Sequence, residues 1–175
     1  MTDFLSLAAE GGFSHCVPLC MAAAVPRREV RGMCAADRCG KWGRCWSCPP
    51  ACGTLEQAAS RIARFDRGIL VQSTAKLADD FDYDGIQALS RTHARRFAAL
   101  ARQMRLLCTR TLPLSAGPCR RCTCPDRPCR YPSRRISAME AYGLLVSDVC
   151  VRSGLAYNYG PGTMTYTSCI LYSEE

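Results

Sequence analysis

The longest periodic pattern in the chain predicts an amphipathic helix from about residue 84 to residue 108. Apolar residues recur there at steps of three and four, which place them on one face of a helix. They are Ile86, Leu89, Phe97, Leu100, Met104 and Leu107. The arginines of this segment fall largely off that face, so the pattern predicts one buried side and one solvated side.

Shorter segments predict strands and further helices. The strands expected from apolar, Thr-rich and Tyr-rich composition are 68–73, 111–115 and 165–172. Residues 13–20 and 24–31 are interpreted as extended segments around prolines. A short helix is expected over 3–10, and the capping boxes Thr54-x-x-Gln57 and Ser137-x-x-Glu140 predict helices to about Phe65 and Gly154.

Helices that alternate with single strands indicate an α/β fold with a small sheet flanked by helices. With 175 residues, of which 48% are hydrophobic, the chain is expected to form one domain over 1–175. No apolar run approaches the roughly 20 residues that span a bilayer. Asp3 and Glu10 occupy the region where a signal peptide carries positive charge, so a cytoplasmic location is expected.

Fourteen cysteines dominate the candidate chemistry. In a reducing compartment they are better explained as metal ligands than as disulfides. Five of them lie in a first cysteine loop (34–52) and four in a second (117–132). The chain has two histidines, which disfavours a zinc site of the Cys2His2 kind.

The second loop contains Cys119, Cys122, Cys124 and Cys129, with prolines that prevent a helix. Short Cys-x-x-Cys and Cys-x-Cys steps let one stretch of backbone direct several sulfurs at one centre. The presence of a single Cys-x-x-Cys step favours iron–sulfur over zinc, which prefers two such steps. Zinc stays open as the alternative.

The first loop has one thiol more than a cluster needs. Its cysteines are Cys34, Cys39, Cys45, Cys48 and Cys52. Trp42 and Trp46 are available to shield a centre from water, which would tune its potential. Cys45, Cys52, Cys16 and Cys20 are the candidates to complete this site.

The chain resembles the DUF2284 family of predicted metal-binding proteins from about residue 31 onward. The first signature comprises Arg31-Gly-Met-Cys34, Cys39, Trp42-Gly43 and Trp46-Ser-Cys48-Pro-Pro. The second comprises Ala116-Gly-Pro-Cys119-x-x-Cys122, Pro128-Cys129-Arg-x-Pro132 and Ser137-x-Met139-Glu140-Ala-Tyr-Gly143. The resemblance implies metal binding, with Cys34, Cys39 and Cys48 as ligands in the first half.

Positive charge exceeds negative charge by 23 residues to 15, a formal net charge of +8. Two [4Fe–4S] centres at about −2 each would reduce this to about +4. The excess is therefore not interpreted as nucleic-acid binding, and no aromatic-rich basic platform accompanies it. Six arginines between 120 and 135 are interpreted as charge compensation for a cluster, or as a dock for an acidic redox partner or an anionic substrate.

Several other residues are assigned to the core or to caps. Cys108, Cys150 and Cys169 fall on apolar faces or in a strand, and His93 continues the long apolar stripe. Glu140 is interpreted as a capping residue and not as a catalytic acid.

These observations predict an iron–sulfur protein, with two [4Fe–4S] clusters, that acts in electron transfer or as a redox accessory. The predicted ligands are Cys34, Cys39, Cys45, Cys48, Cys119, Cys122, Cys124 and Cys129. One alternative is an enzyme in which a cluster held by three cysteines leaves an iron open as a Lewis acid. Another is a structural zinc-binding interaction module.

Overall fold

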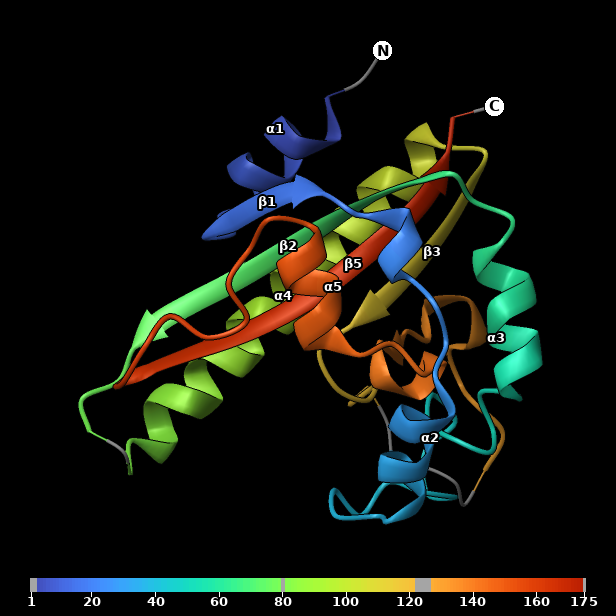
Figure 1. Ribbon diagram of the computed structural model, residues 1–175, viewed down its shortest axis with the longest axis horizontal. Helices are drawn as coiled ribbons and strands as arrows, with labels where there is room; N and C mark the ends of the chain where they lie inside the picture. Colours follow the sequence, from blue (N-terminus) through green and yellow to red (C-terminus); the bar gives the residue numbers. More distant parts are fainter. Residues whose placement is uncertain (1–2, 80, 122–126, 175) are drawn as a thin grey trace.

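A five-stranded sheet lies between two layers of helices in a computed structural model of the chain, which describes residues 3–79, 81–121 and 127–174 (Figure 1). The strands are β1 (His15–Pro18), β2 (Arg67–Lys76), β3 (Arg110–Ser115), β4 (Ser137–Ala138) and β5 (Thr163–Ser173). Their spatial order is β1-β2-β5-β3-β4, and only the β3–β4 pair is parallel. The predicted α/β class is therefore confirmed.

Helices α1 (Phe4–Glu10) and α4 (Tyr83–Leu107) cover one face of the sheet. Phe97, Leu100 and Met104 of α4 pack there against alternate β2 residues, as the periodic stripe predicted. Leu107 was expected in this stripe, but it is 51% exposed. The prediction is wrong at this residue because the helix ends there, and Met104 and Cys108 take the inward positions.

Helices α3 (Leu55–Ile62) and α5 (Val146–Arg152) cover the opposite face. The predicted capping box at the start of α3 is confirmed, because Gln57 N–H donates to Thr54 Oγ1 and Thr54 N–H donates to the Gln57 side chain. Cys150 of α5 and Cys169 of β5 are fully buried in this layer, and Cys108 is buried on the α4 side. These three cysteines belong to the core, as predicted.

Two local predictions are wrong. The segment 24–31, expected to be extended, contains the start of helix α2 (Arg28–Ala35), which follows Pro26 and a short 3-10 helix η1 (Met21–Ala23). The second capping box does not form: Ser137 lies in β4, paired with Leu114, and Glu140 begins a 3-10 helix, η3 (Glu140–Tyr142). Pairing with a distant strand therefore overrides the local capping signal.

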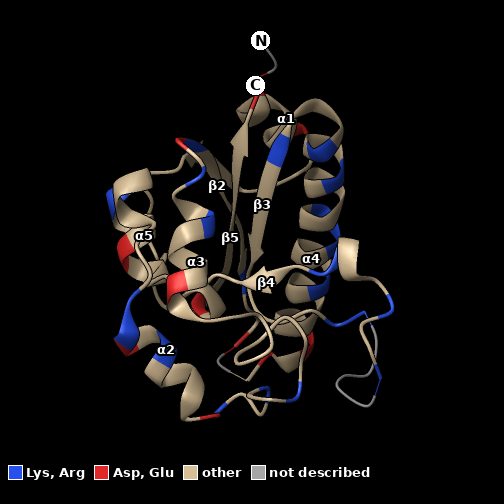
Figure 2. Ribbon diagram, turned by 90° about the vertical axis from the view of Figure 1, so that its right-hand side faces the viewer, with Lys and Arg blue, Asp and Glu red and all other residues tan. Residues whose placement is uncertain are grey.

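The first cysteine loop and the described parts of the second lie at one end of the sheet, beyond the carboxyl end of β3. Figure 1 and Figure 2 show α2 and the loops that follow it below the strands, next to the segment between β3 and β4. The 3-10 helix η2 (Pro132–Arg134) closes the second loop before β4 begins. The short strand β4 then returns the chain to the sheet, directly before η3.

Candidate metal centres

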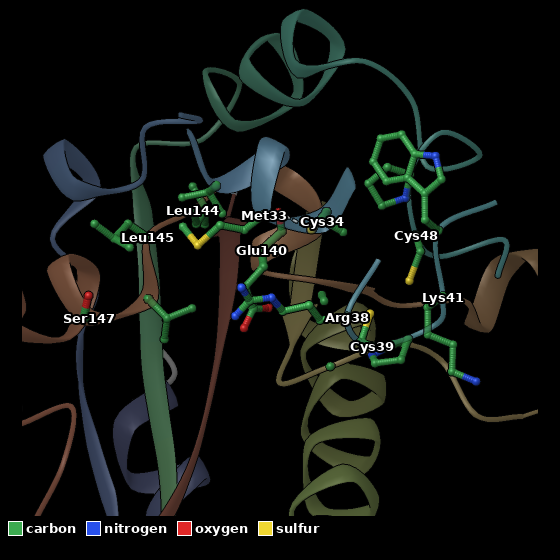
Figure 3. Close-up of a pocket in the computed structure, with 18 of the residues that line it drawn as sticks. Met33, Cys34, Arg38, Cys39, Lys41, Cys48, Glu140, Leu144, Leu145 and Ser147 are labelled. Atoms are coloured by element: carbon green, nitrogen blue, oxygen red, sulfur yellow. Dashed lines mark hydrogen bonds between the residues drawn. The ribbon is translucent and has the colours of Figure 1, made fainter. Parts of the chain in front are cut away.

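Cys34, Cys39 and Cys48 line a cavity of about 440 Å³, called here the first cavity. Cys34 lies in the last turn of α2, not in a loop as expected, whereas Cys39 and Cys48 lie in the segment that follows. Figure 3 shows Met33, Leu144 and Leu145 on one side of this cavity and the Cys39 and Cys48 side chains on the other. The structure thus brings the three thiols of the first signature to one apolar-walled space.

Helix η3 forms one wall of the first cavity and contacts two thiols through its backbone. The Cys34 thiol donates to the carbonyl oxygen of Glu140 at 3.7 Å, and the Cys52 thiol donates to that of Ala141 at 3.7 Å. Cys52 is buried but does not line the cavity. These contacts show how the segment after β4 positions cysteines about a hundred residues earlier in the chain.

Arg31 ties α2 to the same wall. Its guanidinium donates to the carbonyl oxygens of Gly53, at 2.9 Å, and Ala141, at 2.7 Å. The chain after η3 also packs closely against Leu55 at Gly143, where a Cβ would lie 2.6 Å from Leu55 Cδ2. The φ of Gly143, +77°, is a value that glycine adopts readily. Arg31 had no predicted role, although it stands in the first signature.

Burial keeps the thiols of this region protonated in the absence of a metal. It raises the pKa of Cys34 and of Cys52, and burial together with the neighbouring Cys45 raises the pKa of Cys48 to about 12. Thiolates are the form that binds metals, so any metal bound here must displace these protons.

Three charged side chains also line the first cavity: Arg38, Lys41 and Glu140 (Figure 3). Solvent reaches the Glu140 side chain through the cavity, yet the surrounding protein desolvates its carboxyl and raises its pKa. The carboxyl is not the predicted helix cap, because Ser137 lies in β4 and η3 begins without a side-chain cap hydrogen bond. The three side chains give a mostly apolar space a small number of groups that can orient a ligand.

A second and much smaller cavity, of about 10 Å³, is lined by Cys45, Cys119 and Cys129. Its volume is roughly that of one water, so the segments that carry these thiols already lie close together. The Cys45 thiol donates to the carbonyl oxygen of Cys119 at 3.7 Å. The structure therefore places Cys45 with the second cysteine loop, whereas Cys48, three residues later, faces the first cavity.

Ser47 links the two loops at this second cavity. It is fully buried, its Oγ accepts the backbone N–H of Cys119 at 2.9 Å, and it lies 3.2 Å from Cys45 Sγ. Trp46 adds a contact, because its Nε1–H donates to the carbonyl oxygen of Arg127 at 2.9 Å. The sequence predicted no role for Ser47, although Ser47 lies between Trp46 and Cys48 in the first signature.

Comparison with protein families identifies the chain. A family described as "Predicted metal-binding protein (DUF2284)" matches residues 19–172, nearly the whole length. The chain belongs to the DUF2284 family. The resemblance that the two signatures suggested is thereby confirmed, and metal binding is the family's predicted property. No curated protein and no solved structure matches the chain.

The DUF2284 signatures meet in space. The first signature supplies α2, with Arg31 and Cys34, and the segment up to Cys48. The second supplies Cys119, Cys129 and the wall formed by η3. Residues of the two signatures therefore surround both cavities.

The remaining candidate ligands are Cys122, Cys124, Cys16 and Cys20. Cys122 and Cys124 lie outside the described residues. Cys16 packs with the core on the α4 side of the sheet and Cys20 with the core on the other, and neither lines a thiol cavity. Within the described ranges, no three Cys, His, Asp or Glu side chains are close enough together to hold a single metal ion.

At the first cavity Cys34, Cys39 and Cys48 are free thiols, and at the second Cys119 and Cys129 are. Disulfides therefore do not use up these five donors. In the part of the chain that is described, no helix has the length and apolar character needed to cross a membrane.

Proposed function

We propose that this DUF2284 protein holds iron–sulfur centres at the two thiol cavities and serves in electron transfer or as a redox accessory. One observation carries the proposal: Cys45 and Cys48 lie in one turn, in which Cys48 N–H donates to the Cys45 carbonyl oxygen at 3.0 Å. Cys48 lines the first cavity and Cys45 lines the second. Two centres held in this way would be neighbours, as electron passage between them requires.

The donor set fits such centres. Thiolates are soft ligands that suit iron–sulfur clusters and zinc. In a tetrahedral zinc site with Zn–S bonds of about 2.3 Å, the sulfurs lie only about 3.8 Å apart. The described thiols form no such single-ion cluster, and the first cavity has room for a larger group. An iron–sulfur cluster bound there would supply reversible one-electron redox chemistry.

The chain's own residues would control the environment of these centres. Trp42, partly buried, lines the first cavity, and Trp46, also partly buried, lines the second. Both exclude water, while Arg121 and Arg135 bring positive charge to the second cavity. Solvent access and nearby charge both set a cluster's potential. The free thiols suit a reducing compartment such as the cytoplasm.

A second candidate is an enzyme. It is favoured by the size of the first cavity, which falls within the range of small-molecule sites. Arg38 and Lys41 would bind an acidic substrate group, and Glu140, with its raised pKa, would hold a proton near it. Among the described residues, three thiols line this cavity, which is the number that a cluster with an open coordination position would use.

A zinc-binding module is a third candidate, and the small volume of the second cavity favours it there. The volume suits a single ion, although the described thiols that line it would have to move closer together to hold one, whereas a cluster would have to widen the cavity. Zinc at the second cavity would be structural, holding Cys45 against the second loop.

An anaerobic redox titration tests the proposal. Protein purified without oxygen should be coloured and should bleach reversibly on reduction, at potentials within the roughly −700 to +450 mV range of iron–sulfur centres. A colourless protein without a reversible redox transition would contradict an electron-transfer role. Reversible bleaching that responds to small acidic compounds would favour the enzyme instead.

A further inference from the structure

A third cavity, of about 420 Å³, is lined by five arginines and is called here the arginine cavity. It lies beside α4, the segment after β3 and η2. Its arginines are Arg91 and Arg95 of α4, Arg120 and Arg121 after β3, and Arg134 of η2. Figure 2 shows the basic positions along α4 and in the neighbouring loop. Three separate segments thus bring guanidinium groups to one concave space.

These guanidinium groups have no partner within the described ranges. Among the residues that the structure describes, no Asp or Glu lines the arginine cavity. The ion pairs that the described residues form involve Arg27, Arg67 and Arg152, and the arginine side chains that donate hydrogen bonds are likewise other ones. Five sets of planar donors therefore line a shared space in which no described carboxylate pairs with them, an arrangement suited to phosphate or carboxylate groups of a ligand.

Charge compensation for the thiol centres explains only part of this arrangement. Arg121 lines both the arginine cavity and the second thiol cavity, and Arg135 lines the thiol cavity alone. Arg91, Arg95 and Arg134 line only the arginine cavity. Arg120 also lines only the arginine cavity. Four of the five arginines are therefore not explained by charge compensation for the thiolates of the second thiol cavity.

Hydrogen bonds connect the elements that lie beneath these arginines. His93 is 2% exposed, and its two ring nitrogens contact Ser73 Oγ at 2.9 Å and Ser168 Oγ at 2.7 Å. Ser168 Oγ also accepts the N–H of Ala116 at 2.8 Å. Helix α4 is thereby fixed to two strands and to the segment that carries Arg120. These hydrogen bonds hold α4 and the segment after β3 in place relative to the sheet, and His93 has no ring nitrogen left for a ligand.

We propose that the arginine cavity binds a small organic molecule with several negative charges, carried by phosphate or carboxylate groups. Its volume falls within the range of small-molecule sites, and its arginines surround a concave space. A protein partner would instead be expected to contact a broad, flatter surface. Cys119 also lines this cavity, so the bound anion lies beside a thiol of the second thiol cavity. The anion site stands independently of which metal the thiols hold.

Isothermal titration calorimetry on the anaerobically purified full chain at low salt tests the proposal. The probes are fructose 1,6-bisphosphate and propane-1,2,3-tricarboxylate, with glucose as the neutral control. At least one anion should bind, and the pair of probes separates phosphate from carboxylate recognition. The double variant Arg91→Gln/Arg95→Gln should weaken that binding by at least about tenfold, because two charged donors are removed.

Arg102→Gln is the matched control, because Arg102 lies exposed on α4 but does not line the cavity. It should change the affinity less than about twofold. Absence of binding by both anions, or binding that the double variant leaves unchanged, would overturn the proposal. Binding of poly-L-glutamate without either small anion would also overturn it, in favour of an acidic protein partner. Metal content, measured on the same samples, keeps this result separate from the thiol centres.

Discussion

The thiol of Cys45 donates a hydrogen bond to the backbone carbonyl oxygen of Cys119, 3.7 Å away and 74 positions later in the chain. Cys45 therefore belongs to the second thiol cavity, although it lies in the first cysteine loop. We expect Cys45→Ser to remove or alter the second centre and to leave the first intact, with loss of about half of the bound metal. Electron paramagnetic resonance of the reduced protein, together with metal analysis, measures this.

Cys20→Ser is the control for that experiment, because Cys20 is a partly buried thiol that lines neither thiol cavity. It should leave both signals unchanged. Loss of the first centre's signal in Cys45→Ser would assign Cys45 to the first cavity and contradict the geometry.

Ser47 should tune the second centre without holding it. Ser47→Ala removes the Oγ that accepts the Cys119 N–H and that lies 3.2 Å from Cys45 Sγ. Hydrogen bonds near sulfur shift cluster potentials, so we expect a changed reduction potential at unchanged metal content. The partly buried N–H left without a partner should also lower the free energy of unfolding by about 1 kcal/mol. An unchanged potential would show that Ser47 is only structural.

Arg31 should hold the first cavity together. Arg31→Lys cannot reproduce two hydrogen bonds in fixed directions to the Gly53 and Ala141 carbonyl oxygens. We expect the free energy of unfolding in urea to fall by about 2 kcal/mol. Arg28→Lys on the same helix is the matched control, because Arg28 is exposed and donates no such bonds. Equal stability of the two variants would refute this role of Arg31.

His93 should make the stability depend on pH. Burial, assisted by the charge of Arg96, lowers the pKa of His93 to about 4, whereas an unfolded histidine titrates near about 6.5. As the pH falls from about 6.5 to about 4, the unfolded chain takes up a proton that the folded chain does not, so folding is progressively destabilised. The loss should approach about 3 kcal/mol and level off below about pH 4.

The comparison is made between the wild type and His93→Gln, because both keep the same metal ligands. Urea unfolding at several pH values should show the difference between the two proteins shrinking as the pH falls. A difference that stays constant over this range would mean that His93 is charged in the folded protein.

Patterns confined to a few neighbouring residues predicted much of the fold. The Thr54–Gln57 capping box and the stripe through Phe97 and Met104 are each defined by spacing within one helix, and both formed as expected. The Ser137–Glu140 pattern has the same local form, yet β3 draws Ser137 into the sheet. A local signal is lost where a distant strand offers the backbone better hydrogen bonds.

The cysteine grouping could be predicted only in part for the same reason. Spacing identified both loops, and the resemblance identified Cys34, Cys39 and Cys48, which line one cavity. Spacing could not show that a turn directs Cys45 and Cys48 to different cavities, because that depends on where Cys119 lies. The convergence of Arg91 and Arg134 on a third cavity depends on tertiary contacts in the same way.

Metal and sulfide analysis of the anaerobically purified chain tests the central claim most directly. Two thiol-held [4Fe–4S] centres predict about eight iron and about eight acid-labile sulfide per chain, with little zinc. A colourless protein that contains stoichiometric zinc and no acid-labile sulfide would contradict it.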